Sequence, residues 1–168
     1  MKLNRVKLQG LIGLYKGMGV ETIDLDLSGL SGLIALEGDN GKGKTTLLEN
    51  LQPFRTLPSR KLTLKSHCYL KNSFKELWFD FGGDQYHTLV KMDPTTTVSD
   101  EGFIWKNDEP QVNGKVSEFD KYLNKLLGSP SLYFNSIFCA QNSQKMSDLR
   151  PSELKQLFAE FLRLDRYI

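Results

Sequence analysis

The sequence has few cysteines and no long hydrophobic run, and both features narrow the class of protein. Its 168 residues include two cysteines, Cys68 and Cys139, which lie far apart and lack the spacing of zinc ligands. We therefore expect reduced, structural thiols rather than a disulfide framework or a zinc site. No apolar run approaches the roughly 18 residues of a membrane span, and MKLNRVKLQG at the start alternates where a signal peptide is continuously apolar. These features favour a cytoplasmic protein with no membrane partner.

Acidic residues are missing from one segment. Residues 53–75 contain no acid and six bases, whereas residues 93–120 contain seven acids and two bases, so the net charge of +2 hides an uneven distribution. The six bases are Arg55, Arg60, Lys61, Lys65, Lys71 and Lys75. A basic segment of this kind can face the phosphates of a nucleotide or of DNA, and a solvated loop is the alternative.

The composition, 39% hydrophobic and 25% charged, is typical of one globular domain. Alternating patterns predict a strand around Val6 and Leu8 and another over residues 22–27, with turns at the glycines between them. The apolar run 33–37, LIALE, predicts a strand that leads into a glycine-rich loop. A helix follows and ends before Pro53.

The second half predicts an antiparallel hairpin, a further strand and two helices. FKELWFDF and QYHTLVKM flank the turn sequence GGD, and FIWKN predicts the next strand. Apolar residues at helical spacing predict a helix over 116–127 that ends at Gly128, and another that begins at Pro151. Between these helices, NSIFCAQNSQ (135–144) predicts a strand that enters a polar loop.

One motif carries specific chemistry. Gly38, Gly43, Lys44 and Thr45 match the phosphate-loop pattern G-x-x-x-x-G-K-[ST], between a predicted strand and a predicted helix. Glycines let backbone N–H groups wrap around phosphate oxygens, and the start of the helix adds further donors. Lys44 is then expected to reach the outer phosphates, and the Thr45 hydroxyl is expected to ligate Mg²⁺.

A complete phosphate-loop enzyme also needs an acidic residue on a neighbouring strand. Asp80 begins a D-x-x-G sequence, the pattern that small GTPases use near the γ-phosphate. However, apolar and polar residues alternate along its strand, which is typical of a half-exposed hairpin strand and not of the buried parallel strand that the pattern requires. The guanine-reading motif N-K-x-D also fails, because Asn124 and Lys125 are followed by two leucines. A self-contained GTPase is therefore the least favoured interpretation.

Over nearly its whole length, the chain resembles the N-terminal half of the ATPase head of the SbcC/Rad-fifty family, which belongs to the SMC-like ABC ATPases. The resemblance rests on MKLNRVKLQGL, GDNGKGKTT, the hairpin sequence and FNSIFCAQNSQKMSDLRPSELKQLFAEFLRLDRY. It also rests on the order of these stretches and on the spacing between Lys44 and Gln141. LKSHCYL, around His67, is similar to a family segment near the adenine, whereas Ile12 stands where family members often have Arg or Asn.

The resemblance implies a fold and a set of site residues. The fold is an α/β P-loop lobe with an antiparallel β-subdomain: residues 1–150 form the ATPase lobe, and 151–168 form the helix that leads into a coiled coil. Lys44 and the Q-loop glutamine, Gln141, are the implied catalytic residues, and Thr45 and Gln141 are the implied Mg²⁺ ligands. The implied ATP contacts are Asn40, Gly41, Lys42, Gly43, Lys44, Thr45 and Thr46.

The same resemblance implies a function in DNA double-strand-break repair. Two heads would dimerise around ATP, bind DNA and control a nuclease partner of the SbcD/Mre-eleven type. The acidic strand and signature motif are missing from this chain and lie in a C-terminal half in the family, so we expect no hydrolysis by the chain alone. An SMC- or RecF-like DNA clamp, in which ATP acts as a dimerisation switch, is the alternative.

Overall fold

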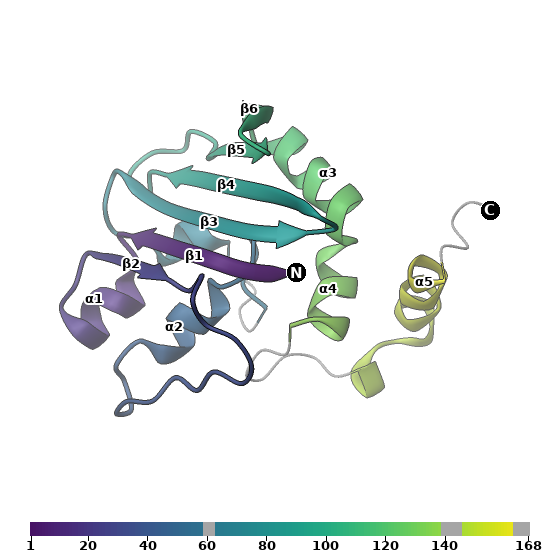
Figure 1. Ribbon diagram of the computed structural model, residues 1–168, viewed down its shortest axis with the longest axis horizontal. Helices are drawn as coiled ribbons and strands as arrows, with labels where there is room; N and C mark the ends of the chain where they lie inside the picture. Colours follow the sequence, from purple (N-terminus) through teal and green to yellow (C-terminus); the bar gives the residue numbers. More distant parts are fainter. Residues whose placement is uncertain (59–62, 139–145, 163–168) are drawn as a thin grey trace.

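The computed structural model describes residues 1–58, 63–138 and 146–162, and its centre is one antiparallel sheet (Figure 1). The sheet has six strands in the order β2-β1-β3-β4-β5-β6, and every neighbouring pair is antiparallel. The strands are β1 (Lys2–Gln9), β2 (Thr22–Asp26), β3 (Ser73–Phe81), β4 (Asp84–Met92), β5 (Glu101–Lys106) and β6 (Glu109–Lys115). The chain is thus a mixed α/β protein.

Helices cover one face of this sheet, which we call the inner face. The helices on this face are α1 (Ile12–Met18), α2 (Lys44–Glu49), α3 (Val116–Leu127) and α4 (Pro130–Ser136), whereas α5 (Pro151–Phe161) contacts α4 and lies apart from the sheet (Figure 1). Short 3₁₀ turns lie at Leu64–His67 and Met146–Asp148. Alternate strand residues such as Val6, Leu77 and Ile104 are buried on the inner face because successive side chains of a strand point to opposite faces. The other face is the outer face.

The predicted hairpin is confirmed. β3 and β4 pair from Ser73 opposite Met92 to Phe81 opposite Asp84, across a turn at Gly82 and Gly83, both of which have positive φ. The predicted strands around Val6, over 22–27 and at FIWKN are also confirmed, as β1, β2 and β5. β6 was not predicted.

The helices after the sheet agree with the apolar spacing. α3 ends before Gly128, as predicted, and buries Phe119, Leu123 and Leu127. The helix packs closely on the sheet at Gly102 of β5, where an added Cβ would lie only 2.7 Å from the Phe119 side chain. α5 begins at Pro151, also as predicted, and packs beside α4, where the Glu160 carboxylate accepts hydrogen bonds from the Ser129 amide and hydroxyl.

Three predicted elements are corrected. The glycine-marked stretch between β1 and β2 holds helix α1, not only turns. Residues 33–37 form no strand: a strand in a parallel sheet needs hydrogen-bonded neighbours on either side, and the described residues offer none to this segment. Residues 135 and 136 end helix α4, because Ser129 caps that helix and Pro130 opens it; residues 139–144 of the same prediction lie outside the described residues.

Candidate phosphate-binding site

The phosphate loop lies between the extended segment 27–37 and helix α2, below the inner face of the sheet (Figure 1). Gly41 and Gly43 have φ of 81° and 79°, a left-handed conformation that other residues rarely adopt, and Gly43 is the N-cap of α2. A Cβ at Gly41 would meet no atom within 4 Å. Glycine therefore stands at the two positions where the loop needs a left-handed backbone, and residues 38–42 of the loop are exposed to solvent.

Lys44 folds back over the loop from the first position of α2. Its Nζ donates hydrogen bonds to the carbonyl oxygens of Gly38 and Asp39, the latter at 2.7 Å. The ammonium group is thus already held over the loop that would bind the phosphates. Thr45 and Thr46 follow on α2 and are half-buried. The predicted ATP contacts, residues 40–46, thus span the loop and the first turn of α2.

Helix α1 packs directly against this loop through two glycines. A Cβ at Gly17 would lie 2.6 Å from the Gly43 amide nitrogen and 2.7 Å from the Gly41 carbonyl oxygen, and a Cβ at Gly13 would lie 2.1 Å from Thr46 Oγ1. Contacts this short leave no space for any side chain. Gly13 and Gly17 are therefore positioning residues for the loop. Their four-residue spacing is typical of one face of a helix, whereas the glycines of this stretch were predicted to form turns.

A cavity of about 240 Å³ adjoins α2 on the side of α1. Ile12 and His67, the two positions that the resemblance relates to nucleotide contacts, both line it, together with Lys16, Thr46 and Asn50. Asn50 is 1% exposed; its amide group donates to the Thr46 carbonyl at 2.7 Å, and its Oδ1 has no hydrogen-bond partner. Asn50 thus places a buried amide side chain at the wall of this cavity. Asn50 was not predicted.

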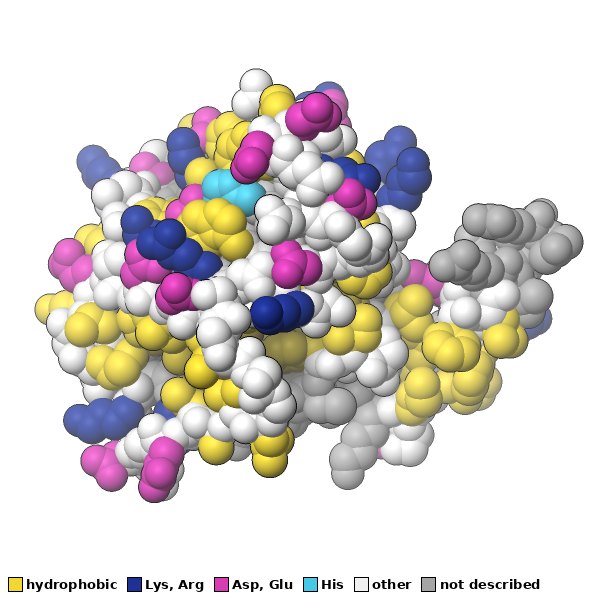
Figure 2. Space-filling view, in the orientation of Figure 1, with side chains coloured by type: hydrophobic (Ala, Val, Ile, Leu, Met, Phe, Trp, Pro, Cys, Tyr) yellow, Lys and Arg dark blue, Asp and Glu magenta, His cyan; other side chains and the backbone are white. Residues whose placement is uncertain are grey.

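The segment in front of the loop exposes its apolar side chains. Leu33, Ile34 and Leu36 are 101%, 58% and 44% exposed. They adjoin a groove of about 520 Å³ that is mostly lined by leucines of β2, of the following segment and of α2. In Figure 2, hydrophobic side chains are scattered along the lower part of the visible face, where this segment runs in Figure 1. We call residues 33–36 with this groove the apolar edge.

Other predicted site residues lie elsewhere. Asp80 is on the outer face of β3, accepts a hydrogen bond from the Asn4 side chain at 2.9 Å, and is separated from α2 by the sheet. The structure therefore does not bring Asp80 to the phosphate loop. Gln141, Cys139, Arg60 and Lys61 lie outside the described residues.

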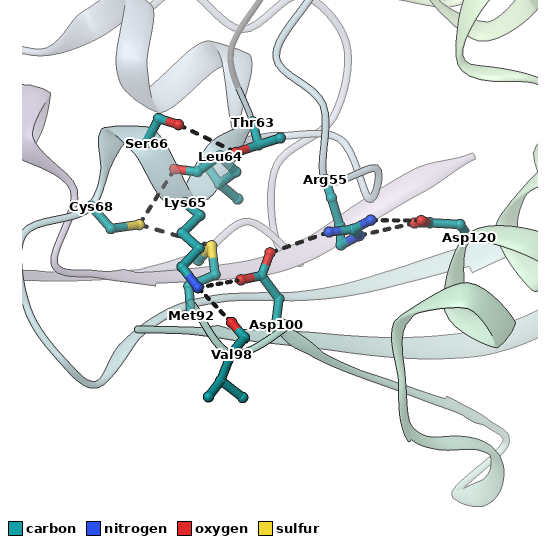
Figure 3. Close-up of polar contacts among 10 residues, drawn as sticks. All are labelled: Arg55, Thr63, Leu64, Lys65, Ser66, Cys68, Met92, Val98, Asp100 and Asp120. Carbon is teal, nitrogen blue, oxygen red and sulfur yellow. Dashed lines mark hydrogen bonds and ion pairs between the residues drawn. The ribbon is translucent and has the colours of Figure 1, made fainter. Parts of the chain in front are cut away.

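Several bases of the acid-free segment are engaged inside the molecule (Figure 3). Arg55 donates two hydrogen bonds to Asp120 of α3, at 3.0 and 2.7 Å, and one to Asp100 at 3.2 Å. The Asp120 bonds are the main reason why the pKa of Arg55 is raised. Lys65 donates to the Val98 carbonyl at 2.6 Å and lies 3.7 Å from Asp100. These contacts tie the segment after α2 to the loop between β4 and β5.

The interior next to this network holds two titratable groups. Lys75 is fully buried on the inner face of β3 and donates to the Phe54 carbonyl at 3.0 Å, and burial lowers its pKa to about 7. Burial also raises the pKa of the Cys68 thiol to about 11. Cys68 lies 3.8 Å from the Met92 sulfur (Figure 3) and is a structural thiol, as predicted.

Within the part of the chain that the structure describes, no group of three or more His, Cys, Asp or Glu residues could hold a metal ion. None of the helices described there is both long enough and apolar enough to cross a membrane. A comparison with protein-family models and with curated protein sequences found no match.

Proposed function

We propose that the chain binds Mg-ATP on its phosphate loop and is the N-terminal half of an SMC-like ABC ATPase head that acts on DNA. The observation that carries this proposal is the complete motif on an open loop whose leading segment, residues 33–37, has apolar side chains and no strand partner among the described residues. A segment of this kind needs neighbouring strands to satisfy its backbone groups. We propose that the C-terminal half of the same head supplies them at the apolar edge.

The residues fit the bound group. The loop amides would surround phosphate oxygens, and Lys44 would exchange its two carbonyl contacts for a charge-assisted bond to phosphate. The Thr45 hydroxyl, with Gln141 as implied by the family resemblance, would ligate Mg²⁺. The cavity beside α2 is lined in part by the polar residues Lys16, Thr46 and Asn50, which would contact a nucleoside. When bound, Mg-ATP would supply the reactive phosphoryl group.

In this proposal the chain binds the nucleotide but does not hydrolyse it alone, since no strand in the described part of the chain brings an acidic side chain to the loop. The assembled head would dimerise on ATP and control a nuclease of the SbcD/Mre-eleven type. An SMC- or RecF-like clamp would share the loop and the apolar edge. Measuring ATP turnover by the assembled head distinguishes the two proposals. The clamp needs ATP mainly for dimerisation, so low turnover would favour it over the repair-type ATPase.

The test is the binding of a fluorescent ATP analogue, with Mg²⁺, to the wild type and to the Lys44→Ala variant. Loss of a charged hydrogen-bond donor is expected to weaken binding by about ten-fold or more. Lys121→Ala, which removes an exposed lysine of α3, is the matched control and should bind like the wild type. Equal affinity in all three proteins would refute binding at the phosphate loop.

A further inference from the structure

Two asparagines of the chain, Asn40 and Asn113, are followed directly by glycine. This pair of residues is chemically labile, because the short asparagine side chain reaches the next backbone nitrogen and glycine has no Cβ to hinder the approach. The reaction needs an exposed asparagine, a free amide on the following residue and a backbone that is not fixed in secondary structure. The structure places the two asparagines in different surroundings.

Asn40 lies in an exposed turn of the phosphate loop, and Asn40 and Gly41 are the central residues of this turn. The turn is closed by a hydrogen bond from the Lys42 amide to the Asp39 carbonyl, which is long at 3.4 Å. Both central residues are exposed, and a Cβ at Gly41 would meet no atom within 4 Å. The Asn40 side chain and water therefore have free access to the Gly41 nitrogen.

The Gly41 amide is also available for reaction. Among the described residues it donates no hydrogen bond, and a phosphate loop uses such free amides to bind phosphate oxygens. The Asn40 side chain likewise has no hydrogen bond within the described part of the chain. The feature that would bind phosphate thus also leaves the Gly41 nitrogen free to attack the Asn40 side chain.

Asn113 is exposed as well, but its backbone is fixed. It lies in β6, where it is paired with Phe103 of β5, and the following Gly114 is paired with Gly102. Reaction at this position requires local opening of the strand pair, which costs free energy. Asn113 is therefore an internal reference with the same pair of residues in a protected setting.

We propose that Asn40 is a site of spontaneous deamidation that inactivates the phosphate loop, and that bound Mg-ATP protects it. The Gly41 nitrogen forms a bond to Cγ of Asn40, and the bond from Cγ to the side-chain nitrogen breaks. Ammonia leaves with the proton that the Gly41 amide gives up. Water then opens the resulting cyclic imide at either carbonyl, which leaves aspartate or isoaspartate at position 40.

Both products would impair the loop. Each adds a negative charge where the phosphates would bind, and isoaspartate also lengthens the backbone by one methylene group. Lengthening would displace Gly41 and Gly43, whose backbone atoms pack against Gly17 of α1. Phosphate oxygens would occupy the Gly41 amide and so block its attack. This protection rests on the proposed function, whereas the deamidation itself does not.

The test is peptide mapping by mass spectrometry of the chain after ageing in mildly alkaline buffer, with and without Mg-ATP. Conversion at Asn40 and at Asn113 is measured in the same samples, and isoaspartate is separated from aspartate by chromatography. The urea-unfolded chain, aged in parallel, gives the rate of each site without structure. Two matched variants, Asn40→Gln and Asn113→Gln, each remove one site, because the longer side chain forms a cyclic imide far more slowly.

We expect Asn40 of the folded chain to react at least about ten-fold faster than Asn113, because Asn113 must first be released from its strand pair. In urea the two rates should be similar. Ageing should lower the ATP affinity of the wild type and of Asn113→Gln but not that of Asn40→Gln, each compared with its own unaged sample. Similar rates at both sites of the folded chain, or full ATP affinity after conversion of Asn40, would overturn the proposal.

Saturating Mg-ATP should slow the reaction at Asn40 and leave the rate at Asn113 unchanged. An Asn40 rate that bound Mg-ATP does not change would overturn the protective role. If the unaged chain binds no ATP, the proposed function fails together with this protection. The ratio of the two rates without nucleotide still decides whether Asn40 is the modification site.

Discussion

At the scale of single residues, Gly17 shows how closely α1 and the phosphate loop are packed. We expect Gly17→Ala to weaken Mg-ATP binding by about ten-fold, because the added methyl group would displace the loop backbone and overpacking costs roughly 1–3 kcal/mol. Calorimetric titration measures this effect. Gly29→Ala is the control, since a Cβ at Gly29 meets nothing within 4 Å. Wild-type affinity in Gly17→Ala would contradict the positioning role.

Lys75 gives stability a specific pH dependence. Its pKa is about 7 in the folded chain and 10.5 in the reference state, so between these values the unfolded chain binds more protons and stability rises with pH. We expect Lys75→Met to remove this rise and to be more stable than the wild type below pH 7. Urea unfolding of both proteins from pH 6 to pH 10 measures the difference, with the exposed Lys71→Met as control. A difference independent of pH would contradict the buried charge.

At the scale of elements, Arg55 joins the segment after α2 to α3 and to the loop before β5. We expect Arg55→Met to lower the free energy of unfolding by about 2 kcal/mol, because Asp100, whose side chain is 8% exposed, would lose its main partner. Arg5→Met, which removes the exposed pair with Asp24, should have a much smaller effect. Urea unfolding measures both free energies. A similar decrease in the free energy of unfolding of both variants would contradict the claim that burial makes the Arg55 contacts more stabilising than the exposed Arg5–Asp24 pair.

The apolar edge gives an element-scale prediction about the backbone. The amides of residues 33–37 pair with no strand that the structure describes, so we expect them to exchange with deuterium much faster than those of β1 and β3, which lie inside the sheet. Hydrogen-exchange mass spectrometry of the free chain tests this. Protection of residues 33–37 equal to that of β3 would mean that these amides are already hydrogen-bonded. That result would contradict the proposal that a second half of the head supplies their strand partners.

The hairpin and helix α3, which alternation and helical spacing predict correctly, pack their apolar residues within the described part of the chain. β3 and β4 carry apolar residues at alternate positions and join at Gly82 and Gly83, so local pattern and tertiary structure agree. β6 was missed because EPQVNGK is polar; its pairing depends on the turn at Asn107 and Asp108, which have positive φ. Residues 33–37 have a strand pattern without strand neighbours.

The candidate site could be predicted in part. The motif gave the loop and Lys44, because phosphate-loop chemistry is encoded in consecutive residues. The spacing of Gly13 and Gly17 indicates one helix face but not its contact with the loop, and nothing local indicates that Asn50 lies at the cavity, because both depend on how α1 and α2 pack together.

At the scale of the whole molecule, two surfaces are left without partners in the described residues. The apolar edge is one, and the end of α5 is the other, where Phe158, Phe161 and Leu162 are exposed. Figure 2 shows hydrophobic side chains gathered over α5. Exposed apolar surfaces of this kind mark sites of interaction. Both agree with a chain that functions as one part of a larger head.

The most direct test of this account is a pair of calorimetric titrations, with Mg-ATP and with Mg-GTP, followed by measurement of phosphate release in the same samples. We predict that ATP binds at least as tightly as GTP and that phosphate release is negligible. Absence of ATP binding, or tight GTP binding with turnover by the chain alone, would contradict the assignment as half of an ABC-type ATPase head.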